Sequence, residues 1–170
     1  MVIEVRVPSI VILVGISGAG KSTFAKKWFA PTEILSSDHC RALIADDEND
    51  QSATLGAFSL LMKIARLRLN QRKLCVVDAT NTTPYERLKF LRLANEFECP
   101  ASAIVFRTEL ATCLERTWTR CDRDIQESAV IRQHKALMAH LPSLPLEGFA
   151  PIWYLREDVV AAGGIEVRRT

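Results

Sequence analysis

A glycine-rich stretch, GISGAGKS at residues 15–22, has the residue types that bind phosphate. It fits the pattern G-x-x-x-x-G-K-[ST] and directly follows the apolar run IVILV, which predicts a strand, then this loop, then a helix. Glycines let the backbone curl so that successive N–H groups point at one phosphate, and the helix N-terminus adds positive charge. We therefore predict that a nucleoside triphosphate contacts Gly15, Ser17, Gly18, Ala19, Gly20, Lys21, Ser22 and Thr23.

Two residues of this loop have more specific expected roles. Lys21 would reach the β- and γ-phosphates, and the hydroxyl of Ser22 would bind Mg²⁺. ATP or another NTP, together with Mg²⁺, is thus the expected cofactor. Such a loop alone does not distinguish a kinase from a GTPase switch or a motor, so the residues that hold an acceptor must lie elsewhere.

A second cluster, SSDHCR at residues 36–41, follows the apolar run EIL. Ligands of open α/β sheets bind beyond the carboxyl ends of the strands, so Asp38 should face the phosphate loop. We assign Asp38 as the base that orients an acceptor hydroxyl and takes its proton; the alternative is a helix cap or a solvated turn acid. Arg41 would share a helical face with Asp38 and suits a substrate phosphate. Because His39 and Cys40 have no partners at ligand spacing, packing or solvent contact is favoured over a metal or thiol role.

Two further acidic segments are candidates for metal binding. DDEND at 46–50 precedes a predicted helix, where acids simply favour the positive end, and we prefer that interpretation to a divalent-ion site. VVDATN at 76–81 ends a predicted strand with Asp78, at the position where a carboxylate holds Mg²⁺ directly or through water. Here the metal role is favoured.

The segment 110–124 carries arginines that would fall within an arc of about 60° on a helix. These are Arg116, Arg120 and Arg123. The opposite side would carry Leu110, Leu114, Trp118 and Cys121. Such a helix resembles a lid that closes over phosphates and neutralises charge during transfer. The alternative is a solvated face paired with the neighbouring acids.

Apolar runs and helical patterns alternate along the chain and must position these residues. Strands are expected at 10–14, 33–37, 74–78, 101–106 and 152–155, and helices at 21–29, 52–70, 84–97 and onward to about 140. Strands without polar alternation are buried on both faces. We therefore predict one doubly wound α/β domain over residues 1–170, with a parallel sheet covered by helices on both sides.

Local patterns predict how two of the helices begin and pack. Thr83, Pro84 and Glu86 form a capping box with proline at the first helical position. In the helix before it, a core stripe is expected to contain Leu55, Phe58, Met62, Ala65 and Leu69. Farther along the chain, His134 is expected to be a core residue.

Composition limits the classes of protein. The formal net charge is +2, from 22 basic and 20 acidic residues, which is too small for nonspecific coating of nucleic acid. The five cysteines show no metal-binding spacing, so we expect reduced thiols and a cytoplasmic location. No apolar run approaches the length of about 18 residues needed to cross a membrane, so no membrane partner is expected.

With these motifs in place, the sequence resembles the 5′-polynucleotide kinase domain of bacterial RNA-repair kinase-phosphatases. GISGAGKSTFAKK, SSDHCR, DDENDQ, VVDATN and RTWTRCDR occur in the same order and spacing. The resemblance implies a P-loop kinase fold with five parallel strands in the order 2-3-1-4-5, helices on both faces and a lid at about 110–140. It also implies transfer of the γ-phosphate of ATP or another NTP to a 5′-OH end of RNA or DNA.

The same resemblance implies roles for individual residues. Lys21, Asp38, Arg41 and Arg116 would be catalytic. Arg41 would bind a phosphate of the acceptor strand, and Gln51 would touch the terminal nucleoside. The lid arginines at 116, 120 and 123 would grip the donor.

Proteins of that family continue into phosphatase and nucleotidyltransferase modules, whose metal and lysine motifs this sequence lacks. The chain therefore resembles the kinase module alone, with the phosphatase and ligase modules expected elsewhere in a larger repair protein. A homo-oligomer is possible. A small-molecule kinase and a nucleotide-binding switch without an acceptor are the rival interpretations.

Overall fold

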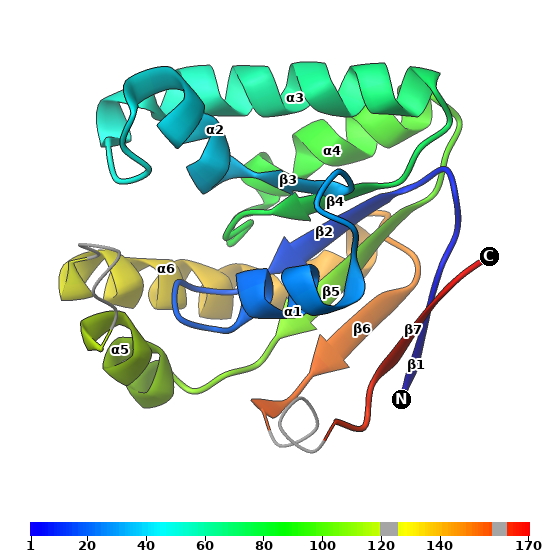
Figure 1. Ribbon diagram of the computed structural model, residues 1–170. Coiled ribbons are helices and arrows are strands. Elements are labelled where there is room, and N and C mark those ends of the chain that lie inside the picture. Colours follow the sequence, from blue (N-terminus) through cyan, green and yellow to red (C-terminus); the bar gives the residue numbers. More distant parts are fainter. Residues whose placement is uncertain (120–125, 158–162) are drawn as a thin grey trace.

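The computed structural model describes residues 1–119, 126–157 and 163–170. At its centre is a parallel five-stranded sheet in the order β3-β4-β2-β5-β6 (Figure 1). Its strands are β2 (Ile10–Val14), β3 (Ile34–Ser36), β4 (Cys75–Asp78), β5 (Ala101–Phe106) and β6 (Ile152–Leu155). Renumbered from one in chain order, these strands have the order 2-3-1-4-5, which confirms the expected topology.

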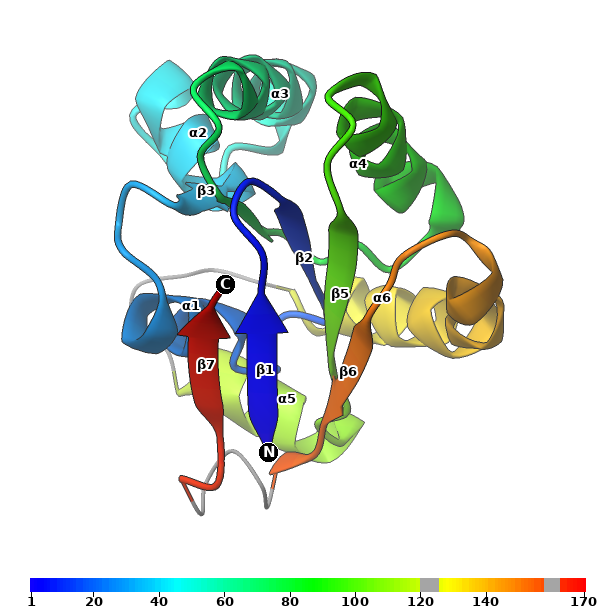
Figure 2. The same ribbon diagram turned by 90° about the vertical axis from the view of Figure 1, so that its right-hand side faces the viewer.

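Helices flank both faces of this sheet, as predicted. They are α1 (Lys21–Trp28), α2 (Ser37–Ala45), α3 (Thr54–Asn70), α4 (Pro84–Glu96), α5 (Leu110–Trp118) and α6 (Glu127–His140), with short 3₁₀ helices η1 (Gln51–Ala53) and η2 (Leu141–Leu146). Figure 2 shows α3, α4 and α6 along one face, and α1 together with a separate strand pair on the other. No helix of the described ranges is both long and apolar enough to span a bilayer.

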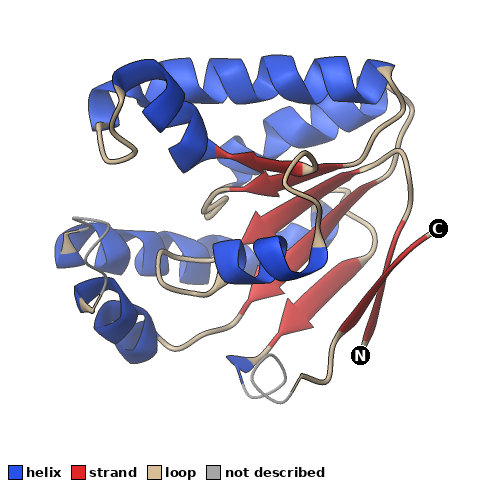
Figure 3. Ribbon diagram, in the orientation of Figure 1, coloured by secondary structure: helices blue, strands red, loops and turns tan. Residues whose placement is uncertain are grey.

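The buried sheet fixes where the functional residues lie. Every residue of β2 is completely buried, as expected for a central strand covered on both faces. β2 pairs with β4 and β5 in parallel register, and β3 pairs with β4 so that Ser36 lies opposite Asp78. The arrowheads of these strands point to one edge in Figure 3. The segments that follow β2, β3 and β4 therefore all begin at that edge.

The second sheet was not predicted from the sequence. β1 (Val2–Val5) and β7 (Glu166–Arg169) form a parallel pair in which Ile3 lies opposite Val167. Ile3 and Val5 are buried, whereas the residues between and before them are exposed. This pair joins the two ends of the chain against the core.

Two expected apolar faces are partly wrong. In α3 the buried positions are Ala57, Leu61, Ala65 and Leu69, while Leu55 is 86% exposed. The buried residues are four apart, and Leu55, two residues before Ala57, lies on the opposite side of the helix. α5 ends at Trp118, which is 66% exposed and does not belong to a buried back face. Arg120, Cys121 and Arg123 lie outside the described residues.

The predicted start of α4 is confirmed. Thr83 accepts a hydrogen bond from the Glu86 backbone N–H, and the Glu86 side chain accepts one from Thr83 N at 2.9 Å. Pro84 occupies the first helical position. Four residues after Thr83, Arg87 points inward from the same helix.

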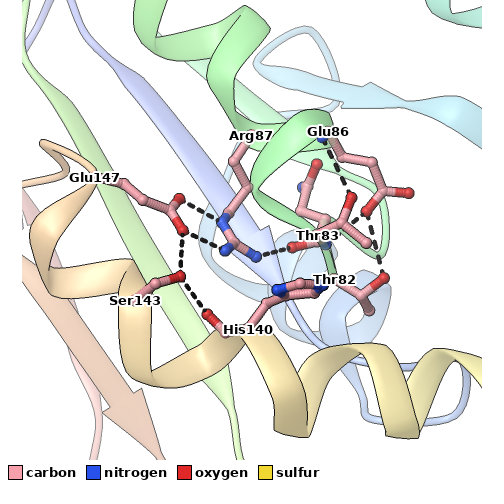
Figure 4. Close-up of polar contacts among 8 residues, drawn as sticks. Thr82, Thr83, Glu86, Arg87, His140, Ser143 and Glu147 are labelled. Carbon is pink, nitrogen blue, oxygen red and sulfur yellow. Dashed lines mark hydrogen bonds and ion pairs between the residues drawn. The ribbon is translucent and has the colours of Figure 1, made fainter.

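Arg87 forms a buried ion pair that ties α4 to the segment after η2 (Figure 4). Its side chain is completely buried and donates to both oxygens of Glu147, at 2.7 and 2.5 Å. It also donates to the carbonyl of Asn81 at 2.8 Å. Ser143 donates to the Glu147 carboxylate at 3.1 Å. Each nitrogen of the guanidinium thus donates a hydrogen bond although the side chain is completely buried.

Glu147→Ala should lower the free energy of unfolding by about 3–5 kcal/mol, because it leaves the Arg87 charge buried without a counterion. Glu96→Ala is the matched control, since it breaks the exposed pair with Arg66 and should cost at most ~1 kcal/mol. Urea unfolding of both variants measures the difference. Equal losses of unfolding free energy in the two variants would show that the buried Arg87–Glu147 pair does not stabilise the fold more than an exposed pair does.

Candidate active site

A cleft of about 1230 Å³ opens beside the loop between β2 and α1. Its lining includes the predicted site residues Ser17, Gly18, Ala19, Gly20, Lys21, Ser22, Thr23, Asp38, Arg41, Gln51, Asp78 and Arg116. Residues predicted from five separate sequence motifs are therefore brought to one place. Gly15 is not part of the lining; its N–H donates to the carbonyl of Thr80 at 3.0 Å, which anchors the start of the loop. Arg120 and Arg123 fall outside the described ranges.

The loop has the tight backbone that its glycines permit. Gly18 and Gly20 have φ angles of 81° and 94°, which other residues rarely adopt. A Cβ on Gly18 would lie 2.4 Å from the carbonyl oxygen of Cys113 in α5. The loop thus passes directly against α5, with no room for a side chain between them.

Side chains from distant segments hold the same loop, and sequence reasoning missed them. The N–H of Ser17 donates to the Gln133 side chain at 2.9 Å, and Thr108 donates to the carbonyl of Ala19 at 3.0 Å. Lys21 is buried and donates to the carbonyl of Ile16 at 2.9 Å. Gln133 and Thr108 also line the cleft. Because they lie about 90 to 116 residues from their partners, no local pattern signals them.

Asp38 and Arg41 form an ion pair on the first turns of α2. Their side chains are 21% and 12% exposed, and Arg41 also donates to the carbonyl of Glu48 at 2.7 Å. Ser36, not Asp38, caps the helix: its hydroxyl accepts from the N–H of His39 at 3.3 Å. The alternative role of Asp38 as the helix cap is therefore wrong, and the shared helical face of Asp38 and Arg41 is confirmed.

His39 and Cys40 lie between Asp38 and Arg41 in the sequence, and their burial differs. Cys40 is buried, and burial raises the pKa of its thiol, so it is packed and protonated. His39 is exposed. Within the described parts of the chain, no group of three or more His, Cys, Asp or Glu side chains could hold a metal ion. Cys40 thus packs inside the protein and His39 contacts solvent, the two surroundings favoured from the sequence.

Asp78 lies at the carboxyl end of β4 and is 7% exposed, while Ser22 lies on the first turn of α1. Both line the cleft. A carboxylate and a hydroxyl are the hard oxygen donors that Mg²⁺ prefers when phosphates supply further ligands. The residues present therefore fit a magnesium ion shared with a bound nucleotide.

The acidic segment 46–50 leads into η1. Asp50 accepts from Ser52 N at 2.8 Å and caps η1, and Asp47 accepts from Asn49 N at 2.9 Å. These contacts support the helix-end interpretation of the acids. Gln51 begins η1 at the cleft wall, where its side chain donates to the carbonyl of Asn49 at 3.2 Å.

Arg116 reaches the phosphate loop from α5. It donates to the carbonyl of Gly18 at 3.4 Å and forms an ion pair with Glu157, which follows β6. Arg132 and Arg156 are two further cleft-lining cations that sequence reasoning did not single out. Burial raises the pKa of the Cys113 thiol to about 11 although Lys21 and Arg116 oppose the shift, so this thiol packs as a neutral group beside the loop.

The fold and this cleft define a P-loop kinase-like α/β domain. Residues 10–144 match the family model described as an AAA domain, and the chain belongs to this family. No curated protein sequence matches the chain significantly.

Solved structures share the architecture at low sequence identity. A chain of the Pnkp1/Rnl/Hen1 RNA repair complex is 21% identical with a TM-score of 0.69, over 81% of this chain and 46% of that one. Kti12 of Chaetomium thermophilum with ADP-AlF3 is 15% identical with a TM-score of 0.67, over 88% and 89% of the two chains. A gluconokinase of Sinorhizobium meliloti is 15% identical with a TM-score of 0.57, over 89% and 83%.

These likenesses establish the fold and leave the acceptor open. The chain spans 46% of the length of the RNA-repair-complex chain, less than half of it.

Gly18→Ala should lower nucleotide affinity at least tenfold, because its Cβ would overlap the Cys113 carbonyl and displace the loop. Gly148→Ala is the control: it also has a positive φ, of 112°, but its Cβ meets only Leu91, at 3.8 Å, and it lies outside the cleft. We expect this variant to lose stability and to retain nucleotide affinity. Titration with a fluorescent ATP analogue compares the two, and unchanged affinity in Gly18→Ala would contradict the packing described.

Proposed function

We propose that the chain is a polynucleotide 5′-hydroxyl kinase, which transfers the γ-phosphate of ATP or another NTP to 5′-OH ends of RNA or DNA in end repair. One observation carries the proposal: the Asp38–Arg41 ion pair lines the same cleft as Lys21 and Ser22. Phosphoryl transfer needs a carboxylate on the acceptor side and a phosphate-binding loop on the donor side, because the γ-phosphoryl moves in line between them.

On the acceptor side, Asp38 orients the incoming hydroxyl and takes its proton as the new bond to phosphorus forms. The ion pair with Arg41 and a hydrogen bond from Ser37 at 3.5 Å hold this carboxylate in the cleft. Arg41 provides a planar guanidinium that suits a phosphate of the acceptor strand. A strand with an internal phosphate near its 5′ end would satisfy both side chains.

On the donor side, the loop amides and Lys21 bind the phosphates, and Ser22 and Asp78 are the residues that would hold Mg²⁺. When bound, the ion would neutralise charge on the β- and γ-phosphates. Lys21 must exchange its hydrogen bond to the Ile16 carbonyl for a phosphate oxygen. Arg116 must likewise exchange Glu157 for the donor, and Arg120 and Arg123 would complete the lid.

Specificity for nucleic acid depends on the cleft residues that contact the acceptor strand. Gln51 lines the cleft together with Arg41 and would contact the terminal nucleoside. The motif resemblance and the likeness to a chain of an RNA repair complex support this choice of substrate, and with it an arrangement in which phosphatase and ligase modules act beside the kinase.

Asp38→Asn should lower the rate of phosphate transfer from labelled ATP to a 5′-OH oligonucleotide by at least ~100-fold, because the amide cannot accept the proton. Nucleotide affinity should stay unchanged, since the substitution keeps the side-chain size. Asp46→Asn, the same change at the other end of α2 and outside the cleft, should leave the rate as it is.

Two other outcomes would contradict the proposal. Transfer to a sugar acid or another metabolite but not to oligonucleotides would make the chain a small-molecule kinase. ATP hydrolysis or binding without any acceptor would make it a nucleotide-dependent switch.

A further inference from the structure

One side of η1 and α3 forms part of the cleft that also contains the Asp38–Arg41 pair. Gln51, Thr54 and Phe58, at spacings of three and four residues, all line it. They cover roughly 10 Å along the helix axis, the length of about three stacked nucleotides. The cleft wall is therefore longer than a single terminal nucleoside requires.

Lys89 and Tyr85 of α4 are not part of the cleft lining itself; they lie beside it, next to the lining residue Phe58. The Lys89 ammonium lies 4.2 Å from the centroid of the Phe58 ring and 6.0 Å from that of Tyr85. Tyr85 and Lys89 are four residues apart and so share one face of α4. Tyr85 is 83% exposed, which leaves most of its ring open to a planar ligand.

The acid nearest to this group is already engaged. Glu86 lines the cleft, but its carboxylate accepts hydrogen bonds from Thr83 N at 2.9 Å and from the Thr82 hydroxyl at 3.3 Å. Burial lowers the pKa of Lys89, an effect that Glu86 opposes. A partly desolvated ammonium forms stronger contacts with an anion than a solvated one does.

We propose that Lys89, Phe58 and Tyr85 form a second acceptor subsite, which binds nucleotides on the 3′ side of the reacting 5′-OH end. This inference rests on the proposed function. Lys89, held over the Phe58 ring, contacts a phosphodiester, and the open Tyr85 ring stacks on a base. A cation beside aromatic rings along a groove is the usual way to bind single strands without sequence preference.

The experiment compares a short acceptor with a long one. Wild type, Lys89→Ala and Tyr85→Ala are each assayed with a nucleoside 3′-monophosphate and with 5′-OH decamers of RNA and of DNA. We expect each variant to lose about tenfold in kcat/KM on the decamers, a typical cost of removing one stacking or phosphate contact. Activity on the monophosphate and the KM for ATP should stay within twofold of wild type.

Two variants serve as controls. Lys63→Ala removes an exposed lysine of α3 that does not belong to the group of Lys89, Phe58 and Tyr85, and it should leave the ratio of the two kcat/KM values unchanged. Lys89→Arg keeps the cation and should restore most of the decamer activity.

The outcomes separate the two proposals. Equal losses on short and long acceptors would show that Lys89 only stabilises the contact between α3 and α4, and no loss on either would show no role; both overturn the second subsite alone. If wild type phosphorylates none of these acceptors, the proposed function fails, and the subsite fails with it.

Discussion

The site depends on the parallel register of β2, β4 and β3. Because these strands are paired in parallel, their carboxyl ends lie at a single edge. At that edge the phosphate loop follows β2, helix α2 follows β3, and Asp78 ends β4. The residues proposed to bind the donor, the acceptor and the metal ion thus line one cleft although their motifs are far apart in the sequence.

A second layer of contacts determines the shape of the phosphate loop. α5 packs against Gly18, and Gln133 of α6 binds the N–H of Ser17. Lys21 and Arg116 are held by internal partners, and in the proposed function phosphate oxygens would replace these partners near the same positions. Such preorganisation limits the ordering that binding must cause.

Much of the fold could be predicted because its signals are local. The five apolar runs became the five strands, and the Thr83 capping box began α4. The β1–β7 pair was missed because it joins two short segments more than 160 residues apart, with only Ile3 and Val5 buried in β1. Leu55 was misplaced because the spacing of the apolar residues fits more than one side of α3, and the sequence does not show which side packs on the sheet.

The candidate site likewise has features that local sequence spacing predicts and features that it does not. Asp38 and Arg41 are three residues apart on one helix, so their pairing could be inferred from spacing. Gln133 and Lys89 could not, because their positions depend on how α6 and α4 pack against segments distant in sequence. What the sequence conveys is local chemistry, and what the fold adds is the set of long-range neighbours.

The most direct measurement is a crystal structure of the chain with Mg²⁺, a non-hydrolysable ATP analogue and a 5′-OH oligonucleotide. We predict an Asp38 carboxylate oxygen within about 3.2 Å of the terminal 5′ oxygen, which itself faces the γ-phosphate. An oligonucleotide end bound elsewhere, with Asp38 directed away from the γ-phosphate, would contradict it.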